Sequence, residues 1–223
     1  MIDPVIIGDC TLYQGDCLEI LPTLGKVDAA ITDPPYGVNF KYESHDDTNH
    51  GYKEWCAEWK QELDNVVDGP MAISCGIANI QDWANPTWIL CWHKPASMGR
   101  CAVGFNNWEP VLIYGKVRNG QIADVFKAPI LPDKSLDGHP CPKPLGWGMA
   151  LVERITKLED IILDPFAGSG TTGVACAKLG RKFIGIELEP KYFDIACKRI
   201  EDAYRQPDMF VEQPKAFKQE SML

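Results

Sequence analysis

The chain has 223 residues, of which 45% are hydrophobic and 24% are charged. This is an ordinary globular composition, and the length suits one α/β domain better than two. The formal net charge of −9 excludes attraction of nucleic acid by overall positive charge. The first residues lack a basic segment followed by an apolar run, and no apolar stretch approaches the roughly 18–20 residues that span a bilayer. We therefore expect neither a signal peptide nor a membrane partner.

Nine cysteines are scattered along the chain. Their number is odd and no C-x-x-C pair occurs, which argues against both a disulfide framework and a zinc ribbon. Several lie within apolar runs, such as Cys75 in MAISCG and Cys91 in WILCWH. We expect reduced thiols in the core of a cytoplasmic protein, and no bound metal.

The first elements surround a proline-rich turn. A short apolar run from Thr11 becomes helical near Cys17, and the compact apolar run 27–32 predicts a buried parallel strand. This strand ends at the sequence Asp-Pro-Pro-Tyr-Gly (33–37), because two prolines neither continue a strand nor start a helix cleanly. The polar segment 40–51 is expected to be a mobile loop.

The rest of the chain alternates amphipathic segments with apolar runs. Apolar residues at helical spacing predict helices, and short continuous apolar runs predict buried strands. Segments 95–108 and 117–142 are rich in turn formers and lack periodicity. The predicted elements are, in chain order, helix 52–67, strand 70–76, strand 88–94, strand 109–116, helix 146–158, strand 160–164, helix 171–180, strand 181–188 and helix 190–206.

This alternation predicts an α/β fold with a mostly parallel, doubly wound sheet. Residues 1–206 are expected to form a single domain, with an insertion at about 94–142 and a poorly ordered C-terminal tail at 207–223. Ligands of such sheets bind at the carboxyl ends of the strands. Because the turns that follow Thr32 and Leu163 both lie at strand carboxyl ends, we expect them to face one crevice.

The turn after Leu163 is the glycine-rich sequence DPFAGSGTTG (164–173) between a strand and a helix. Its glycines let a ligand approach the backbone closely. Glu187 ends the following strand, where an acidic residue accepts hydrogen bonds from ribose hydroxyls. The pattern by itself suits NAD as well as S-adenosylmethionine.

The charge of the glycine-rich turn and its position in the chain distinguish between these two ligands. A dinucleotide brings a pyrophosphate, which binds helix amides and avoids carboxylates. S-adenosylmethionine brings a sulfonium cation and an ammonium group, which Asp164 suits. An NAD-binding fold usually begins with its glycine-rich turn, whereas here 163 residues precede it. S-adenosylmethionine is therefore the expected cofactor, and a NAD-dependent oxidoreductase is a weaker alternative.

The Asp-Pro-Pro-Tyr turn at 33–36 indicates the chemistry. Pro34 and Pro35 fix the backbone and leave carbonyl oxygens free to accept hydrogen bonds, and Asp33 is a second acceptor. Two adjacent acceptors bind both hydrogens of an aromatic amine and aim its lone pair at a methyl donor. Tyr36 offers a flat face on which an extruded base stacks.

Together, TDPPYG (32–37) and the later DPFAGSGTT (164–172) strongly resemble the amino-methylating DNA methyltransferases, which act on adenine N6 or cytosine N4. The order of the two motifs resembles the β-type circular arrangement of that family. The resemblance covers most of residues 10–205. It implies a Rossmann-like methyltransferase fold, a role in DNA methylation and restriction–modification, and an origin in bacteria or their phages.

The resemblance also assigns site residues. Asp16 lies in YQGDC (13–17) and is expected at the cofactor adenine, and Glu187 at its ribose. Lys143 lies in HPCPKP (139–144), which resembles the signature that opens the helix bordering the methionine end. The target-base residues are Asp33, Pro34, Pro35 and Tyr36; the cofactor residues are Asp16, Lys143, Asp164, Phe166, Gly168, Gly170, Thr171 and Glu187.

The expected reaction is site-specific methyl transfer from S-adenosylmethionine to the exocyclic amino group of adenine in double-stranded DNA. In this family Asp-Pro-Pro-Tyr usually accompanies adenine, whereas a serine in the first position is common in cytosine-amino enzymes. Methylation of the cytosine amino group and methylation of RNA by the same chemistry stay open. A non-catalytic DNA-binding relative is a further alternative, which the intact motifs disfavour.

Recognition of the DNA sequence is expected in the insertion 94–142. Residues 94–143 carry seven basic and four acidic groups, so a phosphate backbone prefers this segment to the rest of the acidic chain. The insertion is short for this family. It is consistent with a short recognition sequence, with a homodimer, or with relaxed sequence specificity. Candidate base or phosphate contacts, by residue type, are Arg100, Asn106, Asn107, Arg118, Asn119 and Gln121.

For two further groups of residues we favour a structural role over a functional one. His45, Asp46, Asp47 and His50 resemble a metal cluster only in composition, and we interpret them as part of a solvated loop. Trp88, Trp92 and Trp108 are expected to pack in the core rather than to contact bases.

Overall fold

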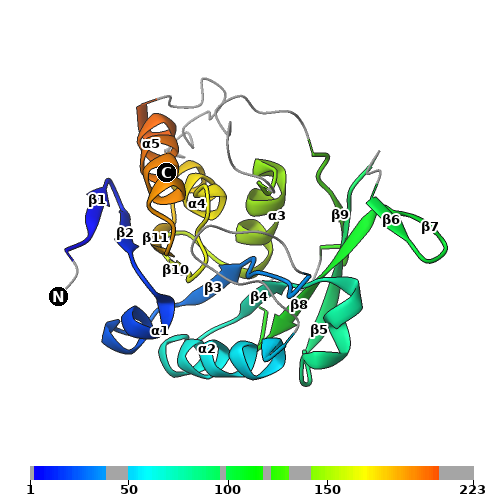
Figure 1. Ribbon diagram of the computed structural model, residues 1–223. Helices are drawn as coiled ribbons and strands as arrows, with labels where there is room; N and C mark the ends of the chain where they lie inside the picture. The colour runs from blue at the N-terminus through cyan, green and yellow to red at the C-terminus, as the bar shows by residue number, and fades with distance from the viewer. Residues whose placement is uncertain (1–2, 39–49, 96–98, 118–121, 131–141, 206–223) are drawn as a thin grey trace, which may run out of the picture.

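The computed structural model describes residues 3–38, 50–95, 99–117, 122–130 and 142–205. One large twisted sheet runs through the molecule, and helices cover both of its faces (Figure 1). The predicted mobile loop, except for its last two residues, and the predicted C-terminal tail lie outside the described residues. Among the described residues, no helix is long and apolar enough to cross a membrane.

The sheet has nine strands in the order β1-β2-β11-β10-β3-β4-β8-β5-β9. The successive pairs from β2 through β11, β10 and β3 to β4 are parallel, and so is the pair β5–β9. The pair β1–β2 is antiparallel, and β8 pairs antiparallel with both β4 and β5. The strands are β1 (Val5–Ile7), β2 (Cys10–Gln14), β3 (Ala29–Thr32), β4 (Met71–Ser74), β5 (Trp88–His93), β8 (Trp108–Tyr114), β9 (Val125–Lys127), β10 (Ile161–Asp164) and β11 (Lys182–Glu187).

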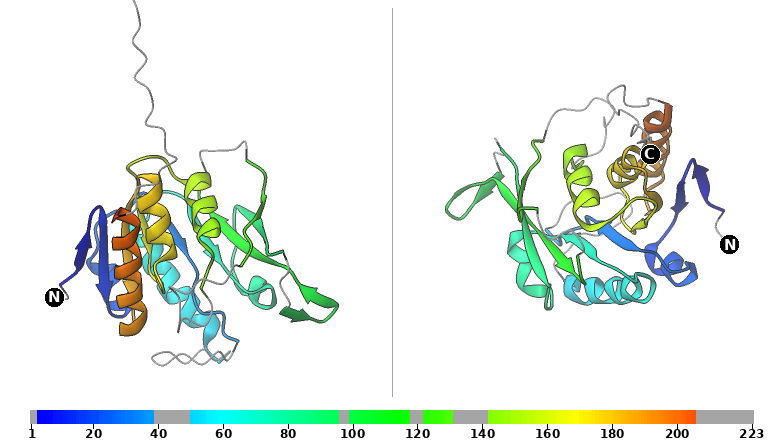
Figure 2. Two further views of the ribbon diagram at one scale, coloured as in Figure 1. Left: turned by 90° about the horizontal axis from the view of Figure 1, so that it is seen from above. Right: turned by 180° about the vertical axis from the view of Figure 1, so that it is seen from behind.

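The helices form two layers, which Figure 2 shows from above and from behind. Helices α3, α4 and α5 cover one face, and α1 and α2 cover the other (Figure 1). The helices are α1 (Cys17–Ile20), α2 (Tyr52–Val66), α3 (Leu145–Ile155), α4 (Thr171–Leu179) and α5 (Pro190–Arg205), with short 3-10 turns η1 (Leu21–Thr23) and η2 (Ile77–Asp82).

Each layer encloses its own hydrophobic core, because successive side chains of a strand point to opposite faces. In β3, Ile31 packs in the core under α3–α5, whereas its neighbour Ala30 packs in the core over α1 and α2. Both residues are fully buried. Strands buried on both faces are continuously apolar, which explains why the sequence pattern identified them.

The predicted α/β architecture is confirmed, with additions at the sheet edges. Strands β1 and β9 were not predicted, because each has only three residues and is stabilised by pairing with β2 or β5. The prediction of core packing holds for Trp92, which is 1% exposed, and is wrong for Trp88 and Trp108, which are 59% and 37% exposed. Trp88 begins β5, beyond the residues of that strand with which β9 pairs.

A separate hairpin projects from the same end of the sheet. Strands β6 (Gly99–Cys101) and β7 (Gly104–Asn106) pair only with each other among the described residues. They form an arm that extends away from the body of the molecule (Figure 1). The sequence predicted no strand here, because the segment is short and rich in glycine and asparagine. The arm joins β5 to β8 and so begins and ends beside the strands that border the site described below.

Candidate active site

A cavity of about 540 Å³ opens at the carboxyl ends of the central strands. Both special turns line it, as the sequence predicted from their positions after β3 and β10. The lining includes every residue assigned to the target base and every residue assigned to the cofactor except Gly170. Those lining residues are Asp33, Pro34, Pro35, Tyr36, Asp16, Lys143, Asp164, Phe166, Gly168, Thr171 and Glu187.

Gly170 contributes to the conformation of the glycine-rich turn without lining the cavity. It is the N-cap of α4 and has a left-handed backbone, with φ of 77°. A Cβ atom there would lie 2.9 Å from Cα of Ala196 in α5. Gly173 has a similar role one turn later, since its Cβ would lie 2.5 Å from Ile200. These glycines let α4 and α5 pack closely, so the turn is held by the core beneath it.

Arg199 of α5 braces the same turn from outside the cavity. Its guanidinium donates to the carbonyl oxygen of Ser169 at 2.5 Å and lies 3.3 Å from the hydroxyl oxygen of Thr171. Thr171 in turn donates to the carbonyl oxygen of Lys143 at 3.0 Å. The turn is therefore tied to α5 and to the segment before α3. Arg199 carries no motif signal and was not predicted as a site residue.

Asp164 organises the junction of the two special turns. It is 3% exposed. Its carboxylate accepts hydrogen bonds from the hydroxyls of Thr32 at 2.8 Å and Thr172 at 2.7 Å, and from the amide of Phe166 at 3.1 Å. Thr32 immediately precedes Asp33, so this carboxylate joins one turn directly to the other. Burial raises the pKa of Asp164 to about 7.

Two carboxylates are fixed by the backbone at the end of the cavity that the sequence predicts to hold the cofactor, here called the cofactor end. Glu187 accepts from the amide of Gly168 at 2.7 Å and from the amide of Glu189 at 2.8 Å. Burial raises the pKa of Glu187, although these amides oppose the shift. Asp16 is the N-cap of α1 and accepts from the amide of Leu18 at 2.9 Å. Both side chains are thus oriented before any ligand arrives.

An aromatic wall and a buried donor complete this end. The ring of Phe166 packs against Trp55 and Trp59 of α2, with centroids 5.5 Å and 5.1 Å apart. Trp147 of α3 lines the cavity and is 1% exposed. Its indole N–H has no hydrogen-bond partner among the described residues. A buried donor without a partner favours a ligand that brings an acceptor.

The Asp-Pro-Pro-Tyr turn lies at the other end of the cavity. The hydroxyl of Tyr36 donates to Oδ1 of Asp33 at 2.6 Å, and the side-chain amide of Asn79 donates to the carbonyl oxygen of Tyr36. Burial, together with the nearby carboxylates Asp33 and Glu109, raises the pKa of Tyr36. The hydroxyl therefore stays protonated and remains a donor.

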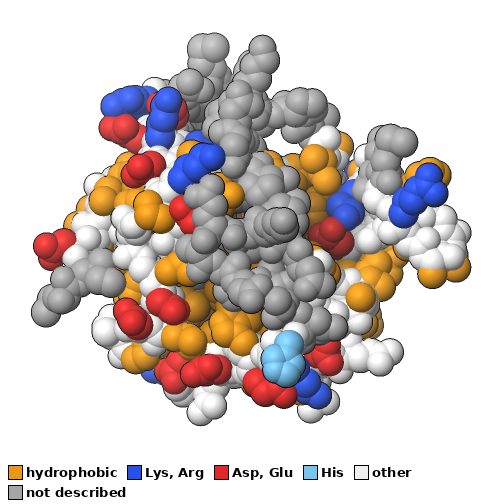
Figure 3. Space-filling view, viewed as in Figure 1, with side chains coloured by type: hydrophobic (Ala, Val, Ile, Leu, Met, Phe, Trp, Pro, Cys, Tyr) orange, Lys and Arg blue, Asp and Glu red, His pale blue; other side chains and the backbone are white. Residues whose placement is uncertain are grey.

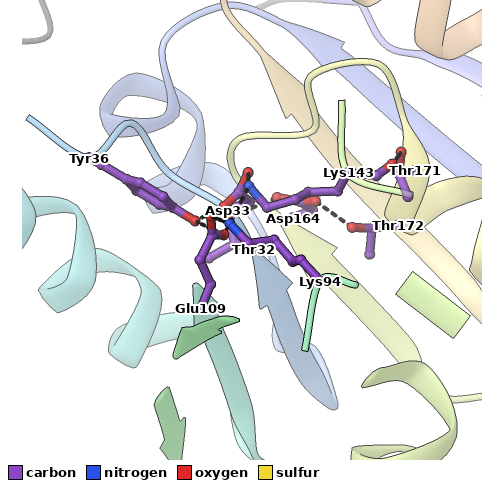
Figure 4. A network of polar contacts seen from close by, with 9 residues as sticks. All are labelled: Thr32, Asp33, Tyr36, Lys94, Glu109, Lys143, Asp164, Thr171 and Thr172. Carbon is purple, nitrogen blue, oxygen red and sulfur yellow. Dashed lines mark hydrogen bonds and ion pairs between the residues drawn. The ribbon is translucent and has the colours of Figure 1, made fainter. Parts of the chain in front are cut away.

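Two lysines and a second carboxylate surround Asp33, as Figure 4 shows. Lys143 donates to Oδ2 of Asp33 at 2.5 Å. Glu109 of β8 binds Lys94, which is 7% exposed and follows the end of β5. The sequence analysis assigned Lys143 to the cofactor and did not consider Lys94 or Glu109 as site residues. Only the pairing of β8 between β4 and β5 brings them beside Asp33.

Candidate recognition residues on the hairpin lie outside the cavity lining. Arg100 is exposed on β6, and Asn106 ends β7. Arg118, Asn119 and Gln121 lie outside the described residues. Three members of the discounted metal cluster also lie outside them, and no group of three potential metal ligands occurs in the part of the chain that is described.

Comparison with known proteins identifies a matching family and similar proteins. Residues 82–198 match the DNA methylase family of N6 and N4 methyltransferases. The type II methyltransferase M2.MboI of Moraxella bovis is 27% identical over 86% of this chain and 87% of its own length. The putative methylase YubD of Escherichia coli K12 is 32% identical over 84% of this chain and 88% of its own.

A solved structure extends this similarity to three dimensions. The M1.HpyAVI–SAM complex superimposes with a TM-score of 0.69 and 30% identity. The match covers 86% of this chain and 98% of that one. The fold that holds the cavity is therefore shared over nearly the whole of that protein.

Proposed function

The chain belongs to the amino-methylating DNA methyltransferases, and we propose that within this family it methylates the exocyclic N6 amino group of adenine at specific sites in double-stranded DNA. The observation that carries the proposal is the single cavity lined by both special turns. The hydrogen bond from Thr32 to Asp164 fixes the distance between two parts of the cavity. One is Asp33, the proposed acceptor for the amine, and the other is the glycine-rich turn, the proposed site of the methyl donor.

The residues of the cavity fit S-adenosylmethionine, the cofactor of this family. Two backbone-oriented carboxylates, Glu187 and Asp16, suit ribose hydroxyls and an adenine amine. The indole N–H of Trp147, which has no hydrogen-bond partner in the described part of the chain, suits a carboxylate. Phe166 supplies an apolar wall. When bound, this cofactor supplies an electrophilic methyl group on a sulfonium.

The chain's own residues prepare the amine for attack. Asp33 and a backbone carbonyl of the proline pair are the proposed acceptors for the two amine hydrogens. The exocyclic nitrogen of a base is a poor nucleophile, so holding its lone pair in line contributes most of the rate. Acceptors that bind more strongly as the nitrogen becomes positive stabilise the transition state selectively. Tyr36 is the proposed stacking surface for the extruded base.

Adenine is proposed because the turn begins with aspartate. Within the family this residue usually accompanies adenine, whereas serine is common in cytosine-amino enzymes. Cytosine also presents an amine beside a ring nitrogen, so it is the second candidate. Nucleoside analysis separates the two directly.

Double-stranded DNA is the proposed partner, and the hairpin arm is the proposed contact. Residues 95–108 contain Arg100 and no acidic residue, in a chain whose net charge is −9. Figure 3 shows basic and apolar side chains together at the end of the arm, whereas acidic side chains gather along the lower edge of the same view. A strand ribbon of this kind fits a groove of DNA. Phosphate contacts then come mainly from the arm.

The deciding experiment is transfer of labelled methyl from S-adenosylmethionine to unmethylated genomic DNA, followed by nucleoside analysis. Labelled N6-methyladenine is the expected product. Labelled N4-methylcytosine would replace the proposed base and keep the reaction. Competition by RNA supplies the second comparison, because preferential labelling of RNA over DNA contradicts the proposed substrate.

A further inference from the structure

The carboxylate proposed to bind the target amine is already engaged. Oδ1 of Asp33 accepts from the hydroxyl of Tyr36 at 2.6 Å, and Oδ2 accepts from the ammonium of Lys143 at 2.5 Å (Figure 4). An amine donor that approaches Asp33 competes with both bonds. Binding of the base is therefore favoured by a second acceptor beside these donors, above all for the Tyr36 hydroxyl, since losing a hydrogen bond in a partly buried site is costly.

Glu109 lies beside both donors. Its Oε2 is 3.4 Å from the hydroxyl of Tyr36 and 4.0 Å from the ammonium of Lys143. Each donor thus lies between the carboxylates of Asp33 and Glu109, with the shorter contact to Asp33. A shift of less than about 1.5 Å brings either donor to hydrogen-bonding distance from Glu109.

Glu109 is itself held in place from the opposite side. Its Oε1 accepts from the buried ammonium of Lys94. The backbone amide of Lys94 donates to the carbonyl oxygen of Asn107 at 2.7 Å, which anchors the lysine to the start of β8. Glu109 therefore has one oxygen fixed by Lys94 and the other directed at the two donors.

We propose that Glu109 is a positioning residue for the methyl transfer, which takes over the Tyr36 hydroxyl and the Lys143 ammonium when Asp33 binds the target amine. This inference rests on the proposed function and names the group that frees the acceptor. The cluster has two carboxylates and two lysines, so its formal charge is zero before and after the exchange. The exchange moves two donors by short distances and leaves the net charge unchanged. It replaces the ammonium partner of Asp33 by the target amine, whose nitrogen becomes positive as the methyl group is transferred.

The principal variant is Glu109→Gln, which keeps the shape and removes the charge. Without that charge, Lys143 remains on Asp33 and the base competes poorly. We expect kcat at saturating DNA to fall by about 10- to 100-fold, the range for a lost hydrogen bond to a charged group. The dissociation constant for S-adenosylmethionine, measured by calorimetry, is expected to stay within about twofold, because the side-chain contacts of Glu109 are with Tyr36, Lys94 and Lys143 beside the Asp-Pro-Pro-Tyr turn.

A stability control is necessary, because Glu109→Gln also leaves Lys94 buried without its partner. The double variant Lys94→Met/Glu109→Gln removes both charges and is expected to restore the melting temperature. Its kcat is expected to remain low, because the second acceptor is still absent. Glu109→Asp keeps the charge on a shorter side chain and is expected to recover part of the lost rate.

A double-mutant cycle with Tyr36→Phe tests the exchange itself. The phenylalanine ring still stacks but has no hydroxyl to transfer. Glu109→Gln is therefore expected to cost at least threefold less in the Tyr36→Phe background than in the natural chain. Equal costs in the two backgrounds contradict the proposal.

Two further results would overturn it. One is a Lys94→Met/Glu109→Gln enzyme whose kcat is within about twofold of the natural value. The other is a loss of cofactor affinity that parallels the loss of rate, which indicates a general disturbance of the cavity. If the natural chain transfers no methyl group to DNA, the proposed function fails, and this inference fails with it.

Discussion

The two ends of the cavity are built in different ways. At the cofactor end, the glycine-rich turn is fixed by core packing, by Arg199 and by the buried carboxylate of Asp164. At the target end, the Asp-Pro-Pro-Tyr turn meets a cluster of charged side chains with alternative partners. One end is determined by backbone and packing, and the other by exchangeable polar contacts.

This difference corresponds to what each end has to do. A cofactor of constant shape is best bound by a preformed surface, since preorganisation lowers the entropy cost of binding. A base that enters from a DNA duplex requires donors and acceptors that change partners. Substitutions at the two ends are therefore expected to have separable effects on cofactor binding, turnover and stability.

The largest expected effect is at the target end. Asp33→Ala removes the proposed amine acceptor, and we expect kcat to fall by about 10³-fold or more, by analogy with the loss of transition-state hydrogen bonds elsewhere. Cofactor affinity is expected to survive, because Asp33 is not among the groups that face the cofactor. Calorimetry and methyl-transfer kinetics check both statements. Joint loss of turnover, cofactor binding and melting temperature would show misfolding instead.

The next effect is on stability at the cofactor end. Gly173→Ala places a Cβ 2.5 Å from Ile200 and 2.8 Å from Phe183, so we expect unfolding to become easier by about 1–3 kcal/mol. Gly25→Ala is a matched control, since nothing lies within 4 Å of its added Cβ. Chemical denaturation of both variants provides the comparison. An unchanged midpoint for Gly173→Ala would show that α4 and α5 are not closely packed.

A pH effect of similar or smaller size is expected from Asp164. Its folded pKa of about 7 lies above the ordinary carboxyl value of 3.8, so the folded state binds the proton more tightly than the unfolded state. The stabilisation is complete below about pH 4 and is lost as the pH rises through 7. Between pH 5 and pH 8 we expect a loss on the order of 1–3 kcal/mol.

Asp164→Asn removes this titration and still accepts from Thr32. Its melting temperature relative to that of the natural chain is therefore expected to rise with pH over this window. Thermal denaturation at several pH values measures the difference, and a difference independent of pH would contradict the raised pKa.

The smallest effect is expected outside the cavity. Arg100→Gln on the hairpin arm should weaken DNA binding by about two- to fivefold and lower the salt dependence by about one phosphate contact. Lys157→Gln is the control, because this exposed lysine lies before the amino end of the central strand β10, whereas the cavity opens at the carboxyl ends of the strands. Fluorescence anisotropy at several salt concentrations measures both. Equal effects of the two variants would remove the arm from the DNA contact.

The sequence by itself determined the α/β architecture and the two turns of the site. Continuous apolar runs mark strands buried on both faces, and their alternation with helices forces the carboxyl ends together. The signals of Asp33–Tyr36 and of the glycine-rich turn are local, because each depends on the backbone properties of proline or glycine. Local properties can be predicted from neighbouring residues.

Only the tertiary structure decided what surrounds those turns. Lys94 and Glu109 are 61 and 76 residues from Asp33 in the sequence and lie near it because β8 inserts antiparallel between β4 and β5. Lys143, 110 residues from Asp33, reaches its carboxylate from the segment before α3. Arg199 likewise reaches Ser169 from the last helix. Lysine, arginine and glutamate are usually solvated surface residues, so no pattern in the sequence distinguishes Lys94, Glu109 or Arg199 as members of the site. Lys143 was marked by its motif, but its contact with Asp33 was not predicted. Their roles arise from burial and from long-range pairing, which are properties of the folded chain.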